Sequence, residues 1–360
     1  MKNITLEDLG LSERYTIEST MYNENLHLAR VSIQHKNIYH IITEEGEMLG
    51  EVSGKFMNNV TSLGEYPAVG DWVLVDRTNN KGGNAIIHHV LTRKSYFERK
   101  VAGRRMDNQV LAANVDTVFI CMALNNNFNV RRLERYIAVA WDSMATPVVV
   151  LTKADLCEDI DEKLIQVEEV AMGIDVLVTS SVSEEGFEKV KEYIGKGKTV
   201  ALIGSSGVGK STMINKILGT CEIETTEVGA GDKGRHTTTH RQMFLVQGGG
   251  ILIDTPGMRE LGMISGDLEK GFSDIEELES KCKFSDCKHE SEPGCAVKKA
   301  IEEGLLSEER LISYKKLQKE LAYSELKAKM AEKEKIKNMF GSTSAMGKIR
   351  KQIKNKNKRR

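Results

Sequence analysis

Cysteines and long apolar runs are scarce in this sequence. Six cysteines in 360 residues are too few for the disulfide framework of a secreted scaffold, so we expect a reducing, cytoplasmic location. No apolar run approaches the roughly 18 residues that a membrane-spanning helix needs, and acidic residues stand where an export signal would need an apolar block. The 40% hydrophobic and 29% charged residues suit buried cores instead, and the length suggests two or three domains.

The net charge of −1 conceals an uneven distribution of charge. Residues 327–360 hold 13 Lys/Arg against two Glu, whereas the other 326 residues carry a net charge of −12. A basic segment on an acidic body is typical of arms that bind nucleic acid, and a solvated end without a partner is the alternative.

The first 95 residues have the pattern of short strands separated by turn residues. The expected strands are Tyr15–Tyr22, Leu26–Gln34, Ile38–Ile42 with a continuation to Val52, Asp71–Arg77 and Ala85–Leu91. About five strands without a helical period predict a small closed barrel of the oligonucleotide-binding (OB) type, and an SH3-like barrel is the alternative. Residues 96–112 then form a basic linker, whose cations and aromatics could hold phosphates and bases or could pack onto the barrel.

From residue 113 to 262 apolar strands alternate with amphipathic helices, which predicts a parallel sheet covered on both faces. The expected strands are Val115–Met122, Pro147–Leu151, Val176–Val178, Thr199–Ile203, Arg241–Val246 and Gly250–Ile253. The expected helices are Val130–Ser143, Asp161–Met172, Glu184–Ile194 and Lys210–Leu218. Beyond this domain the chain reads as helical and charged over 263–325, with a basic tail over 326–360.

A helical stripe is expected at the end of the helical region, where it should pack against the body. Its members are Leu306, Leu311, Tyr314, Leu317, Leu321 and Met330.

The strongest motif is a phosphate-binding loop of the form G-x4-G-K-[ST], placed between a strand and a helix as that motif requires. Its glycines let backbone N–H groups face phosphate oxygens. Lys210 would reach the β- and γ-phosphates, and Ser211 would ligate Mg²⁺. The expected nucleotide contacts are Gly204, Ser205, Ser206, Gly207, Val208, Gly209, Lys210, Ser211 and Thr212.

Two further motifs fit the same nucleotide. Asp254 ends a strand and Gly257 follows three residues later, which suits a metal-side acid and a contact to the γ-phosphate. Thr152, Lys153, Ala154 and Asp155 follow another strand, and a carboxylate there can accept bonds from N1–H and N2 of guanine but not from adenine. Ser180 and Ser181, after the next strand, would offer backbone donors to the guanine O6. Alone, each of these is an ordinary turn or helix cap.

Residues 234–239, Gly-Arg-His-Thr-Thr-Thr, lie between the phosphate loop and Asp254. A threonine hydroxyl here could complete the Mg²⁺ shell only when the γ-phosphate is present. We expect Thr238 to be this Mg²⁺ ligand, with Thr237 as the second candidate. The alternative is a polar loop that does not contact the metal.

Three cysteines and a histidine form a tight cluster at Cys282, Cys287, His289 and Cys295. Three thiolates and an imidazole within 14 residues suit a tetrahedral, structural Zn²⁺, one per chain. Unligated cytosolic thiols are the alternative.

The guanine-reading motifs precede the phosphate loop, the threonine segment and Asp254, an order that amounts to a circular permutation of a GTPase. With the OB-like start and C-x4-C-x-H-x5-C, this set resembles the small-ribosomal-subunit-dependent GTPase A family (RsgA) over residues of about 10–300. The resemblance implies an α/β, circularly permuted P-loop GTPase domain between an OB-like barrel and a helical zinc domain. It also implies a monomeric late assembly factor for the small ribosomal subunit that binds rRNA, with GTP hydrolysis stimulated by the subunit and followed by release. Thr152 stands where many GTPases have Asn, which is expected to weaken one contact near the base.

Catalysis is the least conventional part of the motif set. Met258 stands where many GTPases place the Gln that orients the attacking water, so hydrolysis by the free protein should be slow. Lys210 and Thr238 would act on the phosphates, and His236 would position the water or else contact RNA. Two rival functions stay open: an RNA-binding adaptor in which GTP is only a switch, and a GTPase that uses the tail on anionic lipid.

Overall fold

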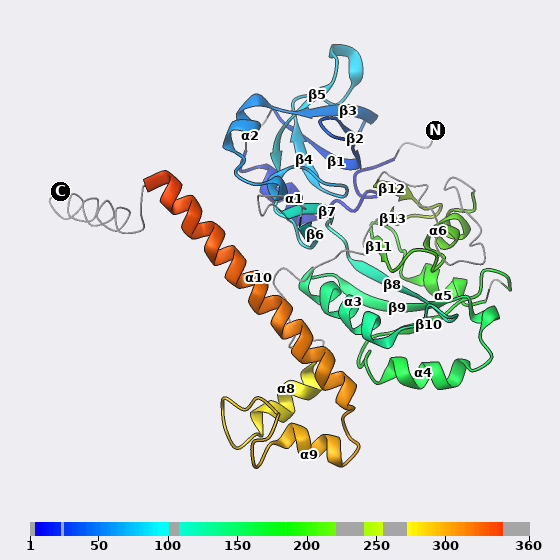
Figure 1. The fold of residues 1–360 in the computed structure, drawn as a ribbon. Coiled ribbons are helices and arrows are strands. Elements are labelled where there is room, and N and C mark those ends of the chain that lie inside the picture. The colour runs from blue at the N-terminus through cyan, green and yellow to red at the C-terminus, as the bar shows by residue number, and fades with distance from the viewer. Residues whose placement is uncertain are drawn as a thin grey trace.

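The structure is a computed structural model that describes residues 4–22, 25–100, 108–183, 185–220, 241–254 and 272–340. It has three regions in chain order: a β-barrel, an α/β domain and a helical C-terminal region (Figure 1). Among the described residues, no helix combines the length and the apolar composition needed to cross a bilayer.

The N-terminal barrel has five strands and is closed. Its strands run in the order β1-β2-β3-β5-β4, and pairing of β1 with β4 closes the ring. β3 and β5 are parallel neighbours while the other pairs are antiparallel. The strands are β1 (His27–Gln34), β2 (Tyr39–Thr43), β3 (Gly46–Val52), β4 (Trp72–Val75) and β5 (Ala85–Val90). The expectation of a small OB-like barrel is confirmed.

One expected strand of this region is wrong, because Tyr15–Tyr22 overlaps the helix α1 (Glu13–Ser19). Ile17 is 53% exposed, so the apparent alternation of apolar residues does not mark a buried face. Only Tyr15 is buried, with its ring 5.8 Å from that of Trp72 and its hydroxyl donating to Asn114 Oδ1 at 2.8 Å. The helix therefore serves to hold one aromatic side chain between the barrel and the next domain. A short helix, α2 (Gly54–Asn59), follows β3.

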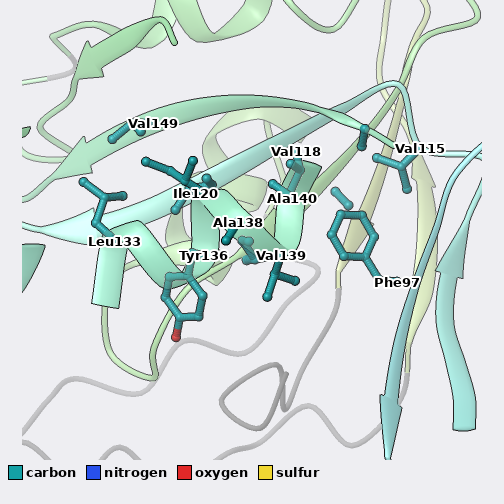
Figure 2. Close-up of a cluster of buried hydrophobic side chains, with 14 of the residues drawn as sticks. Phe97, Val115, Val118, Ile120, Leu133, Tyr136, Ala138, Val139, Ala140 and Val149 are labelled. Atoms are coloured by element: carbon teal, nitrogen blue, oxygen red, sulfur yellow. The ribbon is translucent and has the colours of Figure 1, made fainter. Parts of the chain in front are cut away.

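The basic segment after the barrel forms a two-stranded antiparallel sheet of β6 (Tyr96–Lys100) and β7 (Asn108–Ala113). Phe97 is buried in the same cluster as Ala140 and Val115 (Figure 2). Arg93 donates two bonds to the buried Asp71, at 2.8 and 2.7 Å. Arg93 thus forms an ion pair within the protein, and Phe97 packs in its core.

The α/β domain contains a six-stranded sheet in the order β10-β9-β8-β11-β13-β12. Five strands are parallel, but β12 is antiparallel to β13, so the expectation of a wholly parallel sheet is wrong at this edge. Residues 246–250 are too short a connection for a crossover and allow only a hairpin. The strands are β8 (Thr117–Ala123), β9 (Thr146–Thr152), β10 (Val176–Val178), β11 (Thr199–Ile203), β12 (Gln242–Leu245) and β13 (Ile251–Asp254).

Helices cover the sheet and bury its continuous apolar strands. α3 packs against β8 and β9 through residues that include Leu133, Ala138 and Val149 (Figure 2). The helices are α3 (Val130–Asp142), α4 (Ile160–Glu168), α5 (Phe187–Glu192) and α6 (Lys210–Leu218). Strand β12 also pairs with β1 through Ile33 and Gln242, which joins the barrel and this sheet into one eleven-stranded sheet.

The C-terminal region consists of α8 (Ser273–Ser280), α9 (Ala296–Glu302) and the long helix α10 (Glu308–Phe340). The expected stripe of α10 is confirmed from Leu306 to Leu321, all buried or half-buried in the main core cluster. It is wrong at Met330, which is 59% exposed because α10 runs on beyond α8 and α9 (Figure 1).

Buried charges fix α10 to the α/β domain. The Arg310 guanidinium donates to both oxygens of Asp274 at 2.7 and 2.8 Å and to Glu134 Oε1 of α3 at 3.0 Å. It also lies over the ring of Phe272, 4.8 Å from the centroid. Since Arg310 and Glu134 are almost fully buried, this cluster is a specific joint between the two regions.

Candidate nucleotide site and metal centre

The phosphate loop has the geometry that its sequence predicts. It leaves β11 at Ile203 and enters α6 at Lys210, so the first N–H groups of α6 lie at the loop. Gly204 has φ +147°, and a Cβ there would lie 2.4 Å from the Cys121 carbonyl oxygen. Only glycine fits this turn, which brings the loop backbone close to the sheet.

Lys210 lies across the loop. Its Nζ donates to the carbonyl oxygens of Gly204 and Ser205 at 2.9 and 2.8 Å. The ammonium is therefore held at the concave side of the turn, where a lysine of this motif meets the phosphates. Ser211 and Thr212, the next two residues of α6, are half-buried beside it.

The loop expected to read the base is built by two neighbouring strand ends. Ser180 Oγ donates to Asp155 Oδ1 at 2.6 Å, and the N–H groups of Val182 and Ser183 donate to that same hydroxyl oxygen. The N–H of Ala154 donates to the Thr179 carbonyl at 3.2 Å. The Asp155 carboxylate is thus held by the loop that sequence analysis placed beside it, with one of its oxygens fixed by Ser180.

Thr152 connects the base loop to the phosphate loop. Its hydroxyl donates to the Val208 carbonyl at 2.6 Å and lies 3.4 Å from the Met122 carbonyl. Thr152 is 4% exposed, so this bond is shielded from water. The two sequence-distant motifs are therefore joined directly. The threonine supplies a cross-link to the phosphate loop in place of the asparagine that many GTPases carry at this position.

Sequence analysis missed one polar group at this edge of the sheet. Asn127, after β8, donates from Nδ2 to Ser205 Oγ at 3.2 Å. Arg132 donates to the Asn127 carbonyl at 2.5 Å and to its side-chain oxygen at 2.7 Å. The position of Asn127 was nevertheless predictable, because polar residues at the carboxyl end of a parallel strand gather with those of its neighbours.

Asp254 ends β13 and is 3% exposed. Its register opposite Leu202 of β11 places it next to the strand that leads into the phosphate loop. Four other expected residues, Gly257, His236, Thr237 and Thr238, lie outside the described residues, as does Met258. Ser181 is described and half-buried, directly after Ser180.

The Cys/His cluster is assembled as expected. The ligand atoms of Cys282, Cys287, His289 and Cys295 lie within 4.8 Å of one another. His289 Nδ1 is 3.3 Å from Cys295 Sγ and 3.8 Å from Cys282 Sγ, and the two sulfurs are 4.0 Å apart. Tetrahedral zinc with bonds of about 2.3 Å to sulfur needs ligand separations of about 3.8 Å. The cluster can therefore hold a metal ion.

A second group of residues orients the histidine. His289 Nε2 lies 2.7 Å from Glu279 Oε1, and Tyr314 of α10 donates to Glu279 Oε2 at 3.1 Å. A carboxylate on the outer ring nitrogen fixes the tautomer that leaves Nδ1 free for a metal. The cluster is thereby connected to α10 as well as to α8.

The remaining described cysteines differ from this cluster. Burial raises the pKa of the Cys121 thiol to about 12, which makes it unreactive at neutral pH. Cys157 lies 3.3 Å from Lys163 Nζ, away from the Cys/His cluster. Cys221 lies outside the described residues.

Fold and site together define a class of protein: a P-loop nucleotide-binding domain whose base-reading loops come before the phosphate loop in the chain. The family model for RsgA GTPase matches residues 90–264. A small ribosomal subunit biogenesis GTPase RsgA 2 of Lactiplantibacillus plantarum is 44% identical over 96% of this chain and 98% of its own length. An RsgA 1 of Oceanobacillus iheyensis is 46% identical over 86% of this chain and 90% of its own length.

A solved structure agrees. YjeQ from Thermotoga maritima has a TM-score of 0.61 and 30% identity, and the match covers 82% of this chain and 99% of that chain. YloQ, described as a circularly permuted GTPase, has a TM-score of 0.57 over 84% of this chain and 97% of that chain, at 23% identity, and supports the fold. This chain belongs to the RsgA GTPase family, and its fold is a circularly permuted GTPase domain with an OB-like barrel and a helical C-terminal region.

Proposed function

We propose that this protein is a GTP-hydrolysing assembly factor for the small ribosomal subunit. It binds the subunit and its rRNA in the GTP state, the subunit stimulates hydrolysis, and hydrolysis releases the protein. The observation that carries this proposal is the bond from Thr152 to the Val208 carbonyl, which brings the guanine-reading Asp155 and the phosphate loop into one site. The curated relatives, which carry names for small ribosomal subunit biogenesis, supply the partner.

In this proposal each residue of the site has a defined task. Asp155, held by Ser180, selects guanine, and Lys153 and Thr152 support the base loop. Lys210 and the backbone of residues 204–209 hold the phosphates, while Ser211 and Asp254 hold Mg²⁺, which neutralises phosphate charge. Thr238 completes the Mg²⁺ shell and Gly257 contacts the γ-phosphate. His236 positions the attacking water, because Met258 cannot.

The Cys/His cluster holds one structural Zn²⁺. Three thiolates and one imidazole leave no open position for a substrate, so the ion stabilises the fold of residues 272–320. Removing the metal with a chelator should release about one equivalent of zinc and unfold this region. Retention of α8 and α9 in a metal-free protein would contradict a structural role.

The setting follows from the proposed partner. A factor that meets assembling ribosomal subunits works in the cytoplasm, and the protein acts there as a monomer with no membrane partner.

Two experiments test the proposal. Co-sedimentation with purified small and large subunits, in GDP and in a non-hydrolysable GTP analogue, should show binding to the small subunit that depends on the analogue. Equal pelleting with both subunits regardless of nucleotide would reject the ribosomal role. Single-turnover phosphate release should rise when small subunits are added. His236→Ala should then keep GTP binding and lose the stimulation, whereas a rate unmoved by subunits would favour an adaptor in which GTP is only a switch.

A further inference from the structure

A cavity of about 730 Å³ lies between the barrel and the α/β domain, and none of the described nucleotide-site residues lines it. Its walls come from the β1–β2 turn, from β3, from the segment between α2 and β4, from β7 and from the entry to β12. Arg241 is the member contributed by the α/β domain. The cavity is therefore shared by two regions, which the β1–β12 pair joins beside it.

The strand register sets two of the lining residues opposite each other. Because Ile33 pairs with Gln242 in an antiparallel ladder, Gln34 and Arg241 come next along it. Each has a buried polar atom without a partner in the part of the chain that the structure describes, Gln34 Oε1 and Arg241 Nε. A buried donor without a partner is costly, so Arg241 Nε calls for an acceptor such as a phosphate oxygen, whereas Gln34 Oε1 is an acceptor and would meet a donor.

Positive charge gathers at this cavity. Burial lowers the pKa of Arg241 to about 10, and repulsion from Arg99 adds to the shift. Arg99 adjoins the cavity through Gln109, whose side-chain oxygen accepts its guanidinium at 3.3 Å. Lys36, exposed in the β1–β2 turn, lines the same space. Two cations, Lys36 and Arg241, thus line the cavity, and an anion there would lower the repulsion between Arg241 and Arg99.

Glu51, the one carboxylate in the lining, accepts a hydrogen bond from Asn84 and keeps its negative charge, so the lining holds two cations, Lys36 and Arg241, against one anion.

Apolar and aromatic side chains line the same cavity. Tyr39 and Tyr66 line it together with Met57 and Leu63, which are 51% and 43% exposed. Burial raises the pKa of Tyr39 to about 12, so its phenol stays neutral. Cations and aromatic side chains in one cavity suit a phosphate and a base in one unit, the combination that single-stranded nucleic acid presents.

We propose that this cavity takes one nucleotide of single-stranded RNA, with its phosphate on Arg241 and Lys36 and its base against the accessible side chains of Met57, Leu63 and Tyr66. The inference rests on the proposed function and specifies where RNA meets the protein. Arg241 directly follows residues 221–240, which carry Thr237 and Thr238. The residue that binds the RNA phosphate is therefore in the same stretch of chain as the expected γ-phosphate sensor, three positions after Thr238.

The test measures binding of a fluorescein-labelled 12-nucleotide oligouridylate by anisotropy at several salt concentrations. Removing one phosphate contact should lower the slope of log K against log salt by about 0.7 for a single strand. We expect this decrease in Arg241→Gln and in Lys36→Gln, and a slope near that of the wild type in Arg241→Lys, which keeps the charge. Arg77→Gln is the matched control, because Arg77 is a barrel arginine paired with Asp76 at 2.7 Å.

The outcomes distinguish failure of the proposed function from failure of the RNA-binding cavity. If the wild-type protein binds neither RNA nor small subunits, the proposed function fails. If it binds both and Arg241→Gln and Lys36→Gln keep the wild-type slope, this inference alone is overturned. Because Lys36 is exposed, its variant remains informative even where Arg241→Gln does not fold. Calorimetric binding of inorganic phosphate that both variants abolish, with unchanged RNA slopes, would assign the cavity to a free anion and overturn the RNA occupant.

Discussion

Replacing Arg310 by methionine should detach α10 from the α/β domain. The substitution keeps an unbranched apolar chain in place of the arginine methylenes but removes the three charge-assisted bonds to Asp274 and Glu134. Breaking a buried ion pair costs about 3–5 kcal/mol because one charge is left without its partner. Asp274 is 23% exposed and Glu134 keeps Arg131 at 2.8 Å. Both features reduce the free-energy cost of the substitution, so we expect a cost at the lower end of this range, about 3 kcal/mol.

Hydrogen exchange of the backbone amides over 311–317 measures this loss of α10 stability directly. Since each 1.4 kcal/mol is a factor of about ten, exchange through local opening should become about 100-fold faster. Lys281→Met is the control, because Lys281 pairs with Glu277 on the exposed face of α8, where such a pair contributes about 0–1 kcal/mol. In an Arg310→Met background, Glu134→Gln should cost less than it does alone. Exchange in Arg310→Met that matches the Lys281→Met control would refute the view that this cluster joins the two regions.

Three further predictions concern the nucleotide domain. Thr152→Val leaves the Val208 carbonyl without its donor, a loss of about 1–3 kcal/mol, so calorimetry should show GTP binding that is about tenfold weaker. Thr152→Ser keeps the hydroxyl and should bind GTP as the wild type does. Equal affinity of the two variants for GTP would contradict the cross-link. Gly204→Ala should lower the melting temperature more than Gly209→Ala, because the first Cβ meets the Cys121 carbonyl at 2.4 Å and the second meets nothing within 4 Å; the reverse order would be inconsistent with the turn described. Burial raises the pKa of Cys121 from 9.0 to about 12, and the thiolate is the reactive form of cysteine. Cys121 should therefore resist iodoacetamide at pH 8 until the protein unfolds. Alkylation of Cys121 in the folded protein, detected by mass spectrometry, would contradict this burial.

The motif-bearing part of the fold was predictable because its chemistry is local. The phosphate loop needs a strand, a glycine turn and a helix in direct succession, so residues 199–218 specify their own geometry. The Cys/His cluster likewise lies within 14 residues of sequence. That the loop at Thr152–Asp155 would lie beside Ser180 followed from the rule that carboxyl ends of parallel strands share one edge of the sheet, and the bond from Ser180 to Asp155 agrees with this placement.

Features that depend on distant partners were not predictable. The helix α1 presents Tyr15 to Asn114, 99 residues away in the chain, and no local pattern contains that contact. The antiparallel direction of β12 follows from the short connection to β13, which the composition of the strands does not show. The joint at Arg310 requires Glu134, 176 residues earlier. For Tyr15 and Arg310 the deciding interaction is tertiary, so hydrophobic periodicity alone could not identify it; the hairpin of β12 and β13 depends instead on the length of a local connection, which periodicity does not report.

The most direct test of the account is calorimetric titration of the full-length protein and of Asp155→Asn with GTP, ATP and xanthosine triphosphate, in the presence of Mg²⁺. In the proposed site the Asp155 carboxylate accepts from both N1–H and N2 of guanine, whereas an asparagine amide can also donate to the oxygen that xanthine carries at C2. The wild type should therefore bind GTP and not ATP, and Asp155→Asn should lose GTP and gain xanthosine triphosphate. Binding of ATP in preference to GTP, or an unchanged preference in Asp155→Asn, would contradict a guanine site formed by two sequence-distant loops.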